Sequence, residues 1–224
     1  MKLHACRGRS ARPLMVLAAL CTASAPVLAA IPAQPDAADW RETVQTRAEA
    51  YTAYLQAIDA QRRGDLAQAR RLLEQVLEVD AAALVVRAAR AEVCFQQGDR
   101  VCARNEAERA IRNDAAAAGQ AHEVLAKLAL QRYQASGEED RAETAMEHLS
   151  QAAELRPRQP WAWNVWIGLL VRQGRTDDAE RVARRAAAVP GADSETPWQT
   201  YARGLLEAGR RDQAIATLEE LSES

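Results

Sequence analysis

Residues 64–69 read GDLAQA, and the same kind of stretch returns 34 residues later, where residues 98–103 read GDRVCA. Two further copies lie 35 residues apart, GRTDDA at 174–179 and GRRDQA at 209–214. Each copy follows an apolar stretch with helical spacing and places an Ala five residues after the Gly. A fixed period of this length is typical of stacked helix-turn-helix units. The sequence therefore predicts a helical repeat array.

The 76-residue interval between Gly98 and Gly174 holds one more unit. We expect its turn, near residues 135–140, to be about seven residues longer than the others, with a second helix from Ala145 to Leu155. The Gly of each turn supplies the left-handed backbone that ends a helix. Four side chains are predicted to cap the helices that follow these turns: Asp65, Asp99, Thr176 and Asp212.

This pattern resembles the tetratricopeptide-repeat (TPR) family over about residues 50–224. The family's 34-residue unit has a small residue in the middle of its first helix (A) and an Ala early in its second (B). The matching positions are Ala57, Ala91 and Ala126 in helix A, Trp163, Trp166, Leu170, Trp198, Tyr201, Ala202 and Leu205 in later A helices, and Ala69, Ala103, Ala145, Ala179 and Ala214 in helix B. The resemblance implies an all-α fold, a right-handed α-solenoid of about five repeats at about 50–83, 84–118, 119–159, 160–194 and 195–224.

The composition agrees with packed helices. The 224 residues include 50 Ala but only 10 Gly and 8 Pro, which excludes collagen-like and Pro-rich classes. Arg supplies 27 of the 29 basic residues, yet the formal net charge is −2. This balance argues against nucleic acid or an anionic membrane as a partner. Paired arginines such as Arg70-Arg71 are interpreted as a solvated face.

Residues 1–29 have the layout of a secretory signal peptide: a basic start, an apolar run at 14–21, and small residues before a cleavage point after Ala29 or Ala30. Two alternatives stand, an uncleaved anchor and lipidation at Cys21. Cleavage removes four positive charges and lowers the net charge to −6. We expect a periplasmic or secreted protein, with a linker and N-terminal helix at 30–48, capped by Asp39, and the repeat domain at 49–224.

Cleavage leaves two cysteines, Cys94 and Cys102. In the repeat register Cys94 lies in the last turn of a helix A, and Cys102 opens the following helix B. A helical hairpin brings such positions close to the Cα separation of a disulfide, which an oxidising compartment permits. Secreted cysteine-rich relatives of these repeats have a similar spacing. The alternative is a pair of buried thiols.

The sequence contains none of the common catalytic or metal-binding motifs, so it predicts no enzyme activity, no cofactor and no metal site. His122-Glu123 begins like a zinc-protease helix, but Ala126 stands where the second His is required. His148 is interpreted as an ordinary packed or solvated helix residue.

The resemblance implies that the A helices line a concave surface that holds a protein or peptide of the cell envelope. Projection of the register places ten residues there: Tyr51, Tyr54, Ile58, Glu92, Phe95, Glu123, Lys127, Trp161, Asn164 and Arg172. Two alternative functions stay open, an assembly or pilotin-like factor for an outer-membrane or secretion complex, and a cell-wall enzyme using Glu92 and Glu123. The apolar face of Ile215, Leu218 and Leu221 is either a homodimer or partner contact, or a small tolerated patch.

Overall fold

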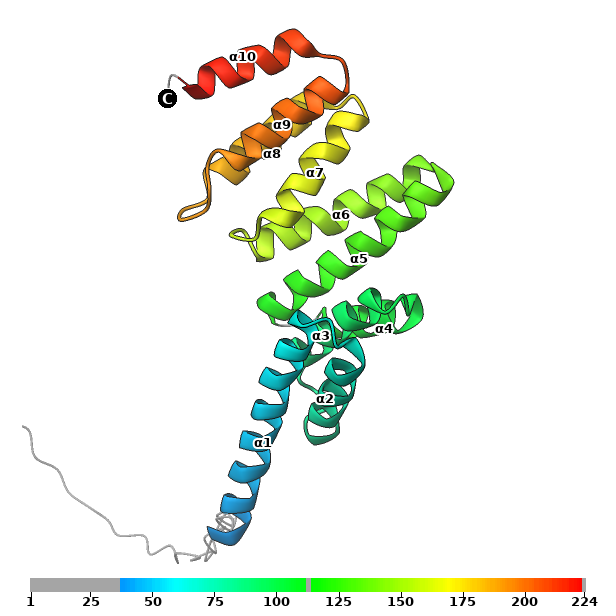
Figure 1. Ribbon diagram of the computed structural model, residues 1–224, viewed down its shortest axis with the longest axis vertical. Helices are drawn as coiled ribbons and strands as arrows, with labels where there is room; N and C mark the ends of the chain where they lie inside the picture. Colours follow the sequence, from blue (N-terminus) through cyan, green and yellow to red (C-terminus); the bar gives the residue numbers. More distant parts are fainter. Residues whose placement is uncertain (1–36, 112–113, 223–224) are drawn as a thin grey trace, which may run out of the picture. The chain divides into compact units, whose positions relative to one another are not determined.

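A computed structural model describes residues 37–222 except 112 and 113. Its helices form five consecutive antiparallel hairpins (Figure 1). The first helix of each hairpin is α1 (Ala37–Arg62), α3 (Leu84–Gln96), α5 (Ala115–Ser136), α7 (Pro160–Arg172) or α9 (Thr196–Glu207). The second is α2 (Leu66–Val79), α4 (Arg100–Ala110), α6 (Glu139–Leu155), α8 (Thr176–Ala187) or α10 (Arg211–Ser222). The predicted all-α repeat solenoid is confirmed.

Each hairpin turn is built around a glycine. Gly64, Gly98, Gly174 and Gly209 have φ between 74° and 80°, the left-handed region in which a Cβ is strained. Asp65 and Asp99 accept hydrogen bonds from the backbone N–H three residues later and so cap α2 and α4, as predicted. The predictions for Thr176 and Asp212 are wrong. Both lie inside their helices, because α8 begins at Thr176 and α10 begins at Arg211.

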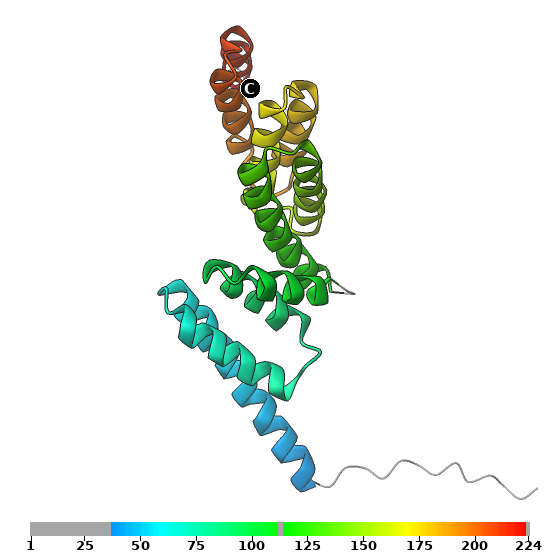
Figure 2. The same ribbon diagram turned by 90° about the vertical axis from the view of Figure 1, so that its right-hand side faces the viewer.

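The small residues of the repeat pattern lie where paired helices touch. Eight alanines predicted at these positions are fully buried: Ala57, Ala69, Ala91, Ala103, Ala126, Ala145, Ala179 and Ala214. Each first helix packs on its own second helix, and from the second hairpin onward it also packs on the second helix of the preceding hairpin (Figure 2). Because Ala has no side chain beyond Cβ, the helix axes approach closely and the larger residues fill the layers between hairpins.

The third hairpin differs from its neighbours in helix length rather than in turn length. Helices α5 and α6 have 22 and 17 residues, and two residues, Gly137 and Glu138, connect them. The prediction of a longer turn is therefore wrong. Ala126 lies 11 residues before Gly137, four more than Ala57 before Gly64, and Ala145 lies three residues further from its Gly than Ala69. Four and three residues are each about one helical turn, so the small residues still face each other.

The N-terminal helix and the first repeat helix form one element. Helix α1 begins at Ala37, so Asp39 lies inside it and the predicted cap at Asp39 is wrong. The predicted signal peptide, its cleavage point and Cys21 lie outside the described residues. Within residues 37–222, where 112 and 113 are not described, no helix has the length and apolarity to span a membrane.

Candidate functional site

Four of the predicted surface residues, from three successive first helices, come together around the ammonium of Lys127. The Lys127 ammonium on α5 lies 2.8 Å from both carboxylate oxygens of Glu92 on α3. It also lies 5.7 Å from the ring centre of Phe95 on α3 and 5.1 Å from that of Trp161 on α7. We call Glu92, Phe95, Lys127 and Trp161 the lysine cluster.

The lysine cluster is half-buried rather than fully solvated. The side chains of Lys127 and Glu92 keep 21% and 15% of their area exposed. An ammonium between two aromatic faces and a carboxylate is attracted by the ring quadrupoles as well as by the opposite charge. Lys127 is one of two lysines in the sequence, and the other is Lys2. A compact ammonium suits this crowded position better than the planar fork of the arginines used elsewhere.

A second ion pair lies beside the lysine cluster. Glu123, one helical turn before Lys127, accepts a hydrogen bond of 2.9 Å from Arg156 at the end of α6. Burial raises the pKa of Glu123, while the charges of Arg156 and Lys127 lower it and that of Glu92 raises it further. Gly119 makes room for this arrangement, because a Cβ there would lie 2.5 Å from Cγ of Arg156.

Of the three predicted residues of α1, two line a separate groove and the third packs against the core. Tyr51 and Tyr54 line an open groove whose other wall is the end of α2 and the start of α3, including Val79 and Val85. Tyr51 is exposed, and burial together with the nearby Tyr51 raises the pKa of Tyr54. Ile58 packs partly against the core of the first hairpin. None of the three takes part in the contacts of the lysine cluster.

Asn164 and Arg172 on α7 also lie away from the lysine cluster's contacts. Asn164 lines a cavity of about 260 Å³ with Pro157, Gly191 and Thr196, and its buried Oδ1 has no hydrogen-bond partner. Arg172 is exposed near the other end of α7. It is 11 residues from Trp161, about 16 Å along the helix axis. The ten predicted residues therefore divide among several places on the repeat domain.

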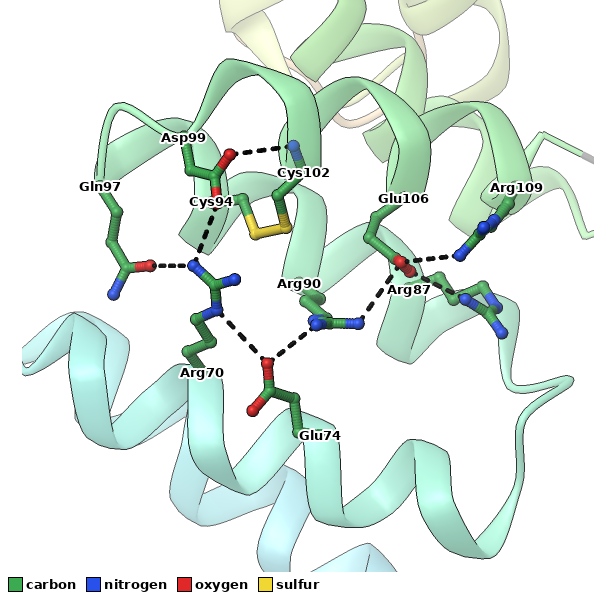
Figure 3. Close-up of a disulfide and its surroundings, with 10 residues drawn as sticks. All are labelled: Arg70, Glu74, Arg87, Arg90, Cys94, Gln97, Asp99, Cys102, Glu106 and Arg109. Carbon is green, nitrogen blue, oxygen red and sulfur yellow. Dashed lines mark hydrogen bonds and ion pairs between the residues drawn. A yellow bond between two sulfur atoms is a disulfide. The ribbon is translucent and has the colours of Figure 1, made fainter.

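A disulfide joins Cys94 and Cys102, whose Cα atoms are 5.8 Å apart (Figure 3). The bridge links the end of α3 to the start of α4, so it restrains the helix that carries Glu92 and Phe95. Cys94, Cys102 and Asp99 are also close enough together to resemble a metal site. Because both sulfurs are in the disulfide, neither supplies the thiolate that a metal requires.

Next to this disulfide, ion pairs connect three helices (Figure 3). The buried carboxylate of Glu106 on α4 accepts from Arg87 at 2.9 Å, Arg109 at 3.2 Å and Arg90 at 3.4 Å. Arg90 on α3 also donates to Glu74 on α2 at 2.8 Å. Sequence reasoning missed this network, because it considered only the paired arginines as a solvated face. Of those, Arg70 pairs here with Glu74 and Asp99. The available signal was the position of Glu106, which shares the helical spacing of the buried residues Ala103 and Ala110.

Two histidines that are 26 residues apart in the sequence meet between α5 and α6. The Nδ1 atoms of His122 and His148 lie 3.0 Å apart. Burial and repulsion from His148 lower the pKa of His122 to about 4. Burial also lowers the pKa of His148, although the charges of Glu147 and Glu108 oppose this. The imidazole that contacts His122 thus lies on the next helix, α6, and not one turn further along α5.

The protein is similar to solved structures in its fold, but its sequence matches no family model and no curated protein. A thermophilic TPR protein from Thermus thermophilus is 18% identical, with a TM-score of 0.56 over 78% of this chain and 90% of that one. MamA is 16% identical, with a TM-score of 0.54 over 75% and 92% of the two chains. The chain has the fold of a TPR solenoid.

A third similar structure is YrrB, described as a TPR protein with an unusual peptide-binding site. It is 16% identical, with a TM-score of 0.51 over 80% of this chain and 88% of that one. At these identities the likeness covers the backbone arrangement. The chemistry of the present solenoid must be inferred from its own side chains.

Proposed function

We propose that the protein is a non-enzymatic scaffold that binds a protein or peptide partner at the lysine cluster. The observation that carries the proposal is the convergence of Glu92, Phe95, Lys127 and Trp161 from three successive first helices. Trp is among the side chains enriched at the energetic centres of protein interfaces, which lie in well-packed, desolvated positions. YrrB, with the same fold, is described as having a peptide-binding site.

The charge balance indicates how a partner would engage this surface. Lys127 is already paired with Glu92, so a partner carboxylate must compete with an internal one for the ammonium. A partner therefore gains most by covering the rings of Phe95 and Trp161 and by completing the hydrogen bonds of the two charges. An extended or helical segment with an apolar residue next to polar ones fits this chemistry.

Lys127→Ala tests the proposal against a matched control, Arg185→Ala. Arg185 is also a cation over a Trp ring, 5.6 Å from Trp163, and pairs with Glu154 at 3.1 Å, but it lies on a second helix, α8. Immobilised wild-type protein is expected to capture specific partners from an envelope extract. Lys127→Ala should lower their recovery at least 10-fold, and Arg185→Ala should leave it within 2-fold. Equal recovery with both variants would contradict the proposal.

We also propose that the protein acts outside the cytoplasm. The support is the pattern of residues 1–29 together with the Cys94–Cys102 disulfide, a bond that persists in oxidising compartments. N-terminal sequencing of the protein from a periplasmic or culture fraction should give a chain that begins at Ala30 or Ile31. A chain that begins at lipidated Cys21 would instead favour the alternative of a membrane-attached assembly factor. Intact cytosolic protein that begins at Met1 would contradict export.

A further inference from the structure

The histidine pair of α5 and α6 has no part in the surface described above. His122 and His148 are both half-buried, their ring centres are 5.2 Å apart, and the ring planes are inclined by 41°. In the metal-free pair one Nδ1 carries a proton and donates it to the other Nδ1. Neutral imidazole can also carry its proton on Nε2, in the other tautomer. Both Nδ1 lone pairs can then be offered to a third atom.

The spacing of the two nitrogens fits a shared metal ion. An ion such as Zn²⁺ binds imidazole nitrogen at about 2.0–2.1 Å. Two such nitrogens in neighbouring coordination positions are then about 2.9–3.4 Å apart, from a right angle to a tetrahedral angle. The observed separation of 3.0 Å lies at the right-angle end of this range. That geometry is the one preferred by Cu²⁺ with nitrogen ligands.

The groups around the pair favour a cation. Glu147 on α6 and Glu108 on α4 both act electrostatically on His148, and both are exposed to solvent. Their negative charges attract a divalent ion. The two ligands come from the two helices of the third hairpin, so an ion would tie α5 to α6 at this point.

We propose that His122 and His148 bind one divalent transition-metal ion, with Cu²⁺ held more tightly than Zn²⁺, through their Nδ1 atoms. The remaining coordination positions are filled by water or by a group from a bound partner. The site stands on the contact between α5 and α6 and is independent of the lysine cluster. Failure of one proposal therefore leaves the other intact.

The test uses the full chain without a histidine tag and with His4→Ala, which leaves His122 and His148 as the two histidines. Calorimetric titration with Cu²⁺, in a buffer containing glycine as a weak competitor, should give one ion per chain. Zn²⁺ should bind at the same stoichiometry and at least 10-fold more weakly. His122→Gln and His148→Gln should each lower the Cu²⁺ affinity at least 10-fold, while Glu207→Gln on α9 should leave it unchanged.

A spectroscopic measurement on the unaltered pair removes any dependence on the folding of the variants. The electron paramagnetic resonance spectrum of bound Cu²⁺ should show splitting from two nitrogens. Labelling histidine with ¹⁵N should change that splitting. Absence of Cu²⁺ uptake, or a spectrum unchanged by the label, would overturn the proposal and leave His122 and His148 as a hydrogen-bonded pair.

Discussion

Replacement of Glu106 by Gln removes the charge at the centre of the ion-pair network that joins the first two hairpins. The Glu106 side chain is 5% exposed and accepts one hydrogen bond of 2.9 Å and two longer ones from arginines. Gln has nearly the same shape, so the change creates no cavity. It replaces one anionic oxygen with an NH₂ group that faces guanidinium donors.

The expected cost follows from what the arginines lose. A hydrogen bond to a charged group contributes about 1.5–3 kcal/mol. Full disruption of a buried pair costs about 3–5 kcal/mol when a charge is left unpaired. Here Arg90 keeps Glu74, and Arg87 keeps the carbonyl of Ala81, so neither is stranded. We therefore expect Glu106→Gln to lower the free energy of unfolding by about 2–3 kcal/mol.

Urea unfolding followed by circular dichroism measures this change, with Glu154→Gln as the matched control. Glu154 pairs with Arg185 between α6 and α8, but both side chains are about half exposed. An exposed pair contributes at most about 1 kcal/mol, and 0.5 M NaCl should weaken it more than the buried network. A loss below about 0.5 kcal/mol for Glu106→Gln, or an equal loss for both variants, would refute the reasoning.

Three other changes have defined outcomes. Reducing the Cys94–Cys102 bridge, which closes a separation of eight residues, should lower the unfolding free energy by about 2–3 kcal/mol, measured by urea unfolding with and without reductant. Gly119→Ala gains helix propensity but pushes against the stem of Arg156, so a net loss of about 1–2 kcal/mol is expected, and a gain would contradict the contact. Because the pKa of His122 falls from 6.5 to about 4 on folding, the unfolded chain binds more protons between these values. Stability should therefore decrease as the pH falls from 6.5 towards 4, by about 1–2 kcal/mol after screening of the half-exposed ring, and metal-free His122→Gln should show a shallower slope.

The sequence predicts the repeat architecture well because its markers are local. A Gly that ends a helix and an Ala at a helix crossing each have a backbone or packing requirement that the chain cannot meet elsewhere. The same reasoning failed for the third hairpin, since a count of extra residues does not say whether they lengthen a turn or two helices. Ala142 follows Gly137 by five residues, the same spacing as in the other four turns. This spacing indicates a turn of normal length, and it was overlooked.

The candidate site was predictable only in part. Repeat register put Glu92, Phe95, Lys127 and Trp161 on the same surface, and the structure brings them together. The same projection did not foresee the separate groove of the α1 tyrosines. The contact between His122 and His148 depends on how far α6 is shifted along α5, which periodicity does not specify. The network around Glu106 likewise depends on the packing of α3 against α2 and α4.

The central claim is that a partner is bound at the lysine cluster, and site-specific photo-crosslinking tests it most directly. A photoreactive amino acid placed at Phe95 lies inside the cluster. The same group at Val101 on α4, whose exposed fraction is 71%, reports a freely accessible position outside it. We expect an envelope protein to be crosslinked from position 95. This crosslink should be lost when Lys127→Ala is added, and no such crosslink should form from position 101. Equal crosslinking from both positions, or none from position 95, would contradict the account.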